Sequence, residues 1–213
     1  MRMLGPRLMG SYYLGAIPLA WTVSGTVGDN AGIIWTNAVT GERAVWRSDG
    51  SGASLGILRM EWIISGTGDF DGDGNSDILL SNTITGDEVI WFMWKTTIVR
   101  NAFIGRVPVQ WKVSAVGDFD GDRKTDIFWS NTVTGDRAIW LMNGSAISDS
   151  NFMGTVPVEW VVSTTGDFNG DWRTDLLWTN TLTEERALWF INAFTKIGGV
   201  SLGVVPLEWV PAK

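Results

Sequence analysis

The chain of 213 residues contains no cysteine and no histidine. Without cysteine there is no disulfide and no thiolate chemistry. Without histidine, the commonest general base and the commonest transition-metal ligand are both missing. A Ser–His–Asp triad, a histidine-ligated zinc site and a cysteine nucleophile are therefore excluded.

Basic residues are also scarce. The 16 Lys and Arg stand against 23 Asp and Glu, which gives a formal net charge of −7. A nucleic-acid binder would need a basic face, so we expect no nucleic-acid partner. The chain has no apolar run of about 18 residues, so we expect no transmembrane segment.

Glycine and tryptophan are abundant, with 26 and 14 residues in a chain that is 45% hydrophobic. This hydrophobic share is typical of a packed chain rather than a disordered one. At about 150 residues per domain, the length corresponds to one domain overall. Many glycines and tryptophans without cysteine indicate short strands, tight turns and large rings in the core.

The sequence repeats itself. Trp62, Trp111, Trp160 and Trp209 are 49 residues apart, and Trp21 lies 41 residues before Trp62. The lead-in Gly-x-x-Pro-x-x-Trp precedes four of these five tryptophans and is altered only before Trp62. A fixed period of this length indicates a repeat architecture such as a propeller.

The third unit shows the order of elements best. Residues 111–114 alternate apolar and polar side chains, which predicts a strand, and a Gly/Asp loop follows at 117–125. Strands are predicted again at 126–131, 137–142 and, more weakly, 148–156, with turns between them. Four short antiparallel strands in about 50 residues are typical of a β-propeller blade. We therefore predict an all-β fold, a β-propeller of four four-stranded antiparallel blades.

The repeat boundaries divide the chain into five segments. We predict a surplus lead-in strand at 1–20, blade 1 at 21–61, blade 2 at 62–110, blade 3 at 111–159, and blade 4 with a closing segment at 160–213. The surplus strand could close the ring beside the last blade, could be the remnant of a larger propeller, or could pair with another copy of the chain.

Most tryptophans recur at fixed blade positions, which predicts core or blade-to-blade packing. One position holds Trp21, Trp62, Trp111, Trp160 and Trp209; a second holds Trp35, Leu80, Trp129 and Trp178; a third holds Trp46, Trp91, Trp140 and Trp189. Trp94 and Trp172 fall outside this pattern and are the candidates for exposed contact residues. Arg43, Arg137 and Arg186 also recur at one position, which indicates ladder pairing or an Arg–carboxylate contact.

Gly/Asp loops carry the candidate metal ligands in three of the four units. Each loop has side-chain oxygens at positions 1, 3, 5 and 9, and the backbone carbonyl of position 7 can add another. The predicted ligand sets are Asp69, Asp71, Asp73, Asn75 and Asp77; Asp118, Asp120, Asp122, Lys124 and Asp126; and Asp167, Asn169, Asp171, Arg173 and Asp175. Calcium prefers six to eight hard oxygen ligands, so the loops predict about three structural Ca²⁺ sites.

Several alternatives are weaker. An EF-hand needs Glu at loop position 12, which these loops lack, and Gly at position 6, where they have Gly74, Arg123 and Trp172. Zinc or copper would want histidine or cysteine. An Asx-rich turn without metal remains the alternative, although three copies share one spacing. The first unit has a shorter loop around Asp29, where we predict no metal.

These loops, within a Trp-x-Val-Ser…Gly-Asp-Phe-Asp-Gly-Asp…Asp-Ile…Trp pattern, resemble the FG-GAP/VCBS repeat family. The resemblance covers residues 15–209 and implies calcium-binding β-propeller blades like those of integrin α-subunits and of bacterial surface and secreted proteins. It implies structural Ca²⁺ in the loop between the first two strands of a blade. The first blade departs from the family by lacking that loop, and integrin-like propellers have seven blades.

The sequence favours a calcium-stabilised, non-catalytic interaction or structural module of a cell-surface or extracellular protein, which could self-assemble. Free calcium outside the cell is high enough to fill modest sites. The alternative is a propeller lectin, with Trp94, Trp172, Tyr12 and Tyr13 as the aromatics free to stack on sugars. We predict no enzyme, because every clustered carboxylate is already assigned to a calcium loop. The partner would be another copy of the chain, or a protein or glycan ligand.

Overall fold

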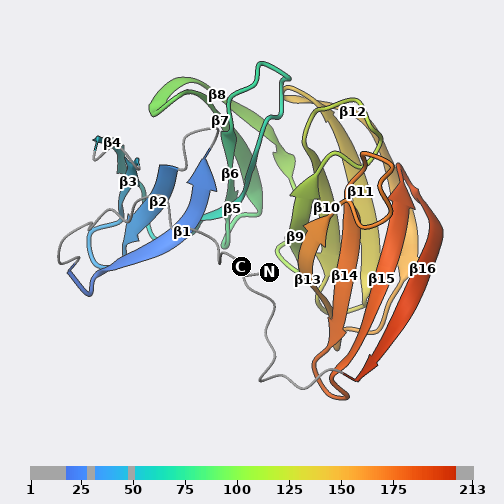
Figure 1. Ribbon diagram of the computed structural model, residues 1–213. Helices are drawn as coiled ribbons and strands as arrows, with labels where there is room; N and C mark the ends of the chain where they lie inside the picture. The colour runs from blue at the N-terminus through green and yellow to red at the C-terminus, as the bar shows by residue number, and fades with distance from the viewer. Residues whose placement is uncertain (1–17, 28–31, 48–50, 205–213) are drawn as a thin grey trace, which may run out of the picture.

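The computed structural model describes residues 18–27, 32–47 and 51–204. This part of the chain forms four antiparallel sheets of four strands each, with the strands of each sheet in sequence order (Figure 1). The strands are β1 (Trp21–Val27), β2 (Gly32–Asn37), β3 (Glu42–Trp46), β4 (Gly52–Ile57), β5 (Trp62–Gly68), β6 (Asp77–Asn82), β7 (Asp87–Trp94), β8 (Thr97–Arg106), β9 (Trp111–Gly117), β10 (Asp126–Asn131), β11 (Asp136–Asn143), β12 (Ala146–Thr155), β13 (Trp160–Gly166), β14 (Asp175–Asn180), β15 (Glu185–Asn192) and β16 (Thr195–Val204).

The four sheets are the blades of a four-blade β-propeller, as the sequence predicted. The first strand of each blade begins at the repeated tryptophan. Neighbouring blades meet through these first strands, with β1 beside β5, β5 beside β9, and β9 beside β13. The described residues of β13 and β1 make no comparable contact, so the ring has a seam between blade 4 and blade 1 (Figure 1).

The hairpin between the second and third strands of each blade is built the same way every time. In blade 1 the Asn37 side chain accepts hydrogen bonds from the backbone N–H groups of Val39 (2.9 Å) and Thr40 (3.0 Å). Asn82, Asn131 and Asn180 repeat this turn in the other blades. A left-handed residue follows, Gly41 with φ of 75° in blade 1, because the tight turn needs a positive φ that glycine tolerates. The local sequence therefore fixes the pairing register.

The hydrophobic core lies between the blades rather than inside any one sheet. Three buried clusters fill the interfaces of blades 1 and 2, 2 and 3, and 3 and 4. Trp129 and Trp178 are almost fully buried, and each packs on the tryptophan of the next strand at a ring-centroid distance of 5.0 Å. The recurrent rings are interface packing, as predicted, whereas Trp94 and Trp172 are exposed.

The last blade presents an interface that no described residue fills. Phe70 and Phe119 are 0% exposed beneath the next blade, but the corresponding Phe168 of blade 4 is 42% exposed. Its seam-facing side therefore shows apolar surface that the other blades bury.

Some predictions fall on residues that the structure does not describe. The surplus strand at 1–20 is described only at Pro18, Leu19 and Ala20, so its pairing and the positions of Tyr12 and Tyr13 lie outside the described residues. The loop around Asp29 and the closing segment with Trp209 lie outside them too.

Candidate metal centres

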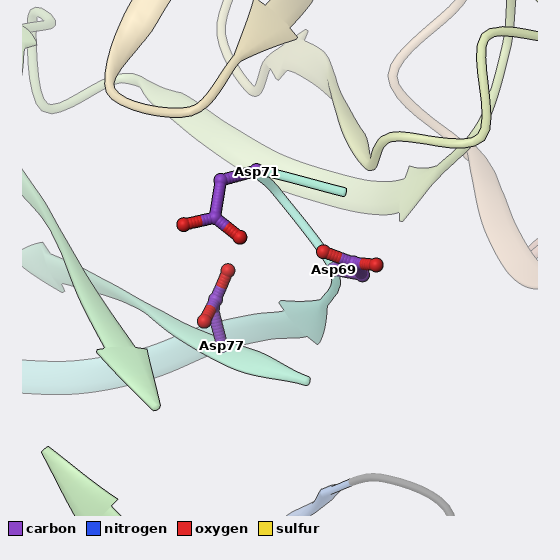
Figure 2. Close-up of side chains that lie close together, drawn as sticks. All are labelled: Asp69, Asp71 and Asp77. Atoms are coloured by element: carbon purple, nitrogen blue, oxygen red, sulfur yellow. The ribbon is translucent and has the colours of Figure 1, made fainter. Parts of the chain in front are cut away.

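Two of the predicted loops each bring three aspartates together. Each loop joins the first two strands of its blade, β5 to β6 in blade 2 and β9 to β10 in blade 3. In blade 2, carboxylate oxygens of Asp69, Asp71 and Asp77 all lie within 4.8 Å of one another (Figure 2). The equivalent triad in blade 3 is Asp118, Asp120 and Asp126.

The aspartate at loop position 1 folds the loop. The Asp69 carboxylate accepts hydrogen bonds from the backbone N–H groups of Gly72 (2.7 Å), Asp73 (3.1 Å) and Gly74 (2.8 Å). Both glycines have a positive φ, 79° and 85°, so the chain can turn back on itself. In blade 3 the second of these positions is Arg123, which is held at a φ of 69°. The loop thus has its shape from backbone bonds before any metal is considered.

The aspartate at position 9 forms the floor of each site. Asp77 begins β6 and is buried; its two oxygens accept hydrogen bonds from the backbone N–H groups of Phe70 (3.0 Å) and Met93 (2.9 Å). Burial raises the pKa of Asp77 to about 7, because desolvation outweighs those two bonds. Asp126 has the same environment, and burial raises its pKa to about 7 as well.

The aspartate at position 3 carries the clearest requirement for a cation. The Oδ1 atom of Asp71 is buried and has no hydrogen-bond partner, while Oδ2 lies 3.5 Å from the Arg100 guanidinium. Burial, and then the charges of Asp73 and Asp69, raise the pKa of Asp71. A buried acceptor without a donor is costly, and a hard cation among the three carboxylates would satisfy it. The residues present therefore fit an oxygen-ligated divalent metal.

The aspartate at position 5 lies outside both triads, contrary to the regular alternation that the sequence suggested. In blade 2 the Oδ1 atom of Asp73 accepts hydrogen bonds from the backbone N–H of Asn75 (2.7 Å) and from its side-chain amide (3.0 Å). In blade 3 the Asp122 carboxylate pairs with the Lys124 ammonium at 2.9 Å. A lysine at position 7 thus neutralises a predicted ligand, which loop spacing alone did not reveal.

The loop of blade 4 forms no such triad of carboxylates. Asp167 accepts three backbone N–H bonds, and these hold its pKa low, with the bond from Trp172 contributing most. At position 3, Asn169 donates its amide to Asp171 at 3.1 Å, and the Arg173 guanidinium lies 3.8 Å from the same carboxylate. Asp175 keeps its floor position, bonded to the backbone N–H groups of Phe168 and Ile191. The loop keeps its fold but points fewer charges at one centre.

The Asp loops also join one blade to the next. The backbone carbonyl of Asp69 accepts a hydrogen bond from the N–H of Thr125 in blade 3 at 2.7 Å. In the same way, the carbonyl of Asp118 accepts one from the N–H of Thr174 in blade 4. The next carbonyl along, that of Phe70, accepts the N–H of Gly144 at 2.8 Å. Each triad therefore lies at a blade–blade contact.

No protein-family model matches the chain, and no curated protein matches it. Its class therefore rests on its own geometry: it is a four-blade β-propeller with two aspartate triads that could hold metal ions. The described residues include no helix that could cross a membrane.

Proposed function

We propose that the protein is a calcium-stabilised, non-catalytic interaction or structural module of a cell-surface or extracellular protein. The observation that carries the proposal is the pair of aspartate triads, each on a loop folded in advance by its own backbone bonds. Calcium suits an irregular set of carboxylate and carbonyl oxygens, whereas magnesium demands near-octahedral geometry and keeps more water. The resemblance of these loops to FG-GAP/VCBS repeats supports the same ion.

The role we assign to the ion is structural. A cation that binds only the folded loop stabilises the fold by linkage, and both triad loops accept backbone bonds from the following blade. Extracellular calcium is high enough to fill sites of modest affinity. A third site in blade 4, with Asp167, Asn169, Asp171, Arg173 and Asp175, stays a prediction.

Calcium titration by isothermal calorimetry tests the proposal. We expect the two triad sites in each chain, with calcium preferred over magnesium, and a third site if the blade 4 loop also binds. Asp71→Asn should remove one site and Asp120→Asn the other, because each replaces a carboxylate of a triad by an amide. Asp149→Asn makes the same charge change on the exposed strand β12 and should leave both sites intact. Equal heats for all three variants would contradict the assignment.

The seam of blade 4 supports an interaction role. Phe168 is exposed where its counterparts are buried, and the described residues offer no partner to the backbone carbonyls of Asp167 and Phe168, whose equivalents in blades 2 and 3 accept hydrogen bonds from the next blade. A blade of a second copy of the chain would present the matching apolar rings and N–H donors. Light scattering tests this self-assembly: the mass should exceed that of a 23.4 kDa monomer, and Phe168→Asp should reduce it.

A carbohydrate-binding propeller is the second candidate. Trp94 is 57% exposed and Trp172 is 88% exposed, as sugar-stacking rings would need to be. They come from different blade positions, the end of β7 and the loop before β14, so they do not form a repeated pocket. A glycan-array signal that disappears with Trp94→Ala or Trp172→Ala would favour this function over the first.

A further inference from the structure

The interface between blades 2 and 3 has a cavity where another interface has an arginine. Arg43 of blade 1 is buried and donates from its two terminal nitrogens to the backbone carbonyls of Gly41 and Trp62, each at 2.8 Å. It thereby ties its own hairpin to the first residue of the next blade. Arg137 of blade 3 does the same toward Trp160, at 3.0 Å. Arg43 and Arg137 therefore contact backbone carbonyls, whereas the sequence indicated ladder pairing or an Arg–carboxylate contact.

Blade 2 breaks this pattern with Glu88. The residue occupies the place of Arg43 in the hairpin register, since Glu88 pairs with Ser81 as Arg43 pairs with Thr36. A carboxylate cannot donate to the next blade's first carbonyl, that of Trp111. The contact that Arg43 makes with Trp62 is therefore missing here.

A cavity of about 220 Å³ fills that space. Its lining includes Gly86, Glu88 and Trp111, which correspond one by one to Gly41, Arg43 and Trp62 of the preceding interface. Ile63 and Val109 also line it and are 42% and 41% exposed, so the cavity reaches the surface. The cavity lies where an arginine head group lies in the preceding interface.

Glu88 is a buried carboxyl group without a close cation. It is 3% exposed, and within the described residues its carboxyl group accepts one hydrogen bond, from the Ser81 hydroxyl at 2.6 Å. It forms no ion pair within 4 Å in the part of the chain that the structure describes. Lys112 lines the same cavity but is itself exposed. Burying an unpaired carboxylate is costly, and the cost is relieved when a donor cation arrives.

We propose that this cavity binds a guanidinium group, supplied by a free arginine-like molecule or by an arginine side chain of a partner protein. The Glu88 carboxylate would accept two of its N–H groups in a fork geometry. The Trp111 carbonyl would accept a third, as the Trp62 carbonyl accepts one from Arg43. The ligand would complete the interface in trans in the way that Arg43 and Arg137 complete theirs in cis.

The electrostatic environment agrees with this geometry. Burial raises the pKa of Glu88 to about 7, the Ser81 bond and the Lys112 ammonium offset part of the shift, and the nearby Asp87 adds to it. A bound cation favours the ionised carboxylate. Binding should therefore weaken below neutral pH.

Calorimetry with N-acetyl-arginine methylamide, at a saturating and constant calcium concentration, tests the proposal. The citrulline analogue has the same shape without the charge and should bind at least about tenfold more weakly, since charge-assisted bonds are the strong ones. Free arginine in parallel distinguishes the two sources: binding of the capped probe means that a protein side chain fits, and binding of free arginine alone means a small-molecule ligand.

Two variants decide whether Glu88 is the site. Glu88→Gln keeps the shape and the Ser81 contact and should lose probe binding, while Glu185→Gln on an exposed edge of β15 should not. Glu88→Arg should also lose binding and should raise the melting temperature, because it restores the guanidinium of the other blades. The proposal fails if the probe does not bind the wild-type protein at about 10 mM, well above a millimolar Kd, or if Glu88→Gln binds it unchanged. Because calcium is saturating and constant throughout, neither result bears on the calcium sites.

Discussion

Replacing Asp71 by asparagine should change the stability of the protein in opposite directions with and without calcium. Without metal, Asp71 is an anion beside Asp69 and Asp73 with one buried oxygen that has no donor. The amide removes that repulsion. With calcium the same substitution removes a ligand, so the variant should lose the stabilisation that the ion gives.

The size of each effect follows from the site. The side chain of Asp71 is 30% exposed and the substitution also weakens its contact with Arg100. Screening by solvent therefore limits the metal-free effect to within about 1 kcal/mol. At a calcium concentration about 100 times Kd, one site adds about 2.7 kcal/mol to the wild-type free energy of unfolding. For a domain of this size that is a melting-temperature difference of roughly 5–10 °C.

Urea unfolding followed by tryptophan fluorescence measures both values, since the chain has 14 tryptophans. Wild type, Asp71→Asn and the control Asp149→Asn are each unfolded in chelator and in calcium. The variant should equal or exceed the wild type in chelator and fall below it in calcium, while the control follows the wild type in both. A variant that differs from the wild type by the same amount in the two conditions would refute the reasoning.

Three further predictions concern pH, the position-7 lysine and the seam. The pKa values of Asp77 and Asp126 are raised to about 7 in the folded protein, whereas the unfolded chain releases these protons at its ordinary pKa near 3.8. The metal-free protein should therefore lose stability as pH rises from about 4 to about 7. Calcium competes with the protons, so it should bind more tightly as pH rises through about 7. Melting curves of the metal-free protein and calcium calorimetry on either side of neutrality measure the two trends, and a trend of the opposite sign in either would contradict the reasoning. Lys124→Ala should tighten calcium binding to the blade 3 loop several-fold, because the Lys124 ammonium no longer occupies Asp122; weaker binding in a terbium competition assay would show that the lysine helps the site. In the dilute monomer, Phe119→Ala should cost about 3–5 kcal/mol as a buried ring, whereas Phe168→Ala on the exposed seam should cost under about 2 kcal/mol; equal costs in denaturant unfolding of the monomer would contradict an exposed seam.

The blades were predictable because the signals that form them are local. The Gly-x-x-Pro-x-x-Trp lead-in, the alternation that follows and the Asn-x-x-x-Gly turn all lie within a few residues of the contacts they make. The outer strand was the weakest prediction, and β12 shows why. Seven of its ten residues in a row are exposed, so no burial alternation marks it in the sequence. Its pairing with β11 comes from the neighbouring strand rather than from its own pattern.

The candidate metal site was predictable only in part. Positions 1, 3 and 9 converge because backbone bonds to Asp69 and Asp77 fix the loop, and those bonds follow from the spacing of Asp and Gly. Position 5 does not converge, because Asp73 contacts Asn75 and Asp122 contacts Lys124. Which of two neighbours a flexible carboxylate contacts depends on side-chain geometry that spacing does not contain.

The Glu88 cavity was missed although the sequence held a signal for it. Arg43, Arg137 and Arg186 recur at one blade position, and Glu88 is the exception to that series. A recurring residue indicates a shared contact, and an exception indicates where that contact is absent. The nature of the contact, a bond across the interface to the next blade's first carbonyl, needed the structure.

The two triads occur in the loops onto which a following blade is docked. The backbone carbonyl of Asp69 accepts a hydrogen bond from the N–H of Thr125, and that of Asp118 accepts one from the N–H of Thr174. The loop that brings the carboxylates together therefore also contacts the next blade. Blade 4 has no following blade among the described residues, and its loop has Asn169 where the other two have aspartate. Among the three Gly/Asp loops, charge and blade docking therefore vary together, whereas blade 1 contacts blade 2 without such a loop. A cation bound by a triad would order the loop whose two backbone carbonyls accept hydrogen bonds from the neighbouring blade. Its stabilising effect would therefore act between blades more than within them. In this fold the ions would serve the interfaces, which are also where its hydrophobic core lies.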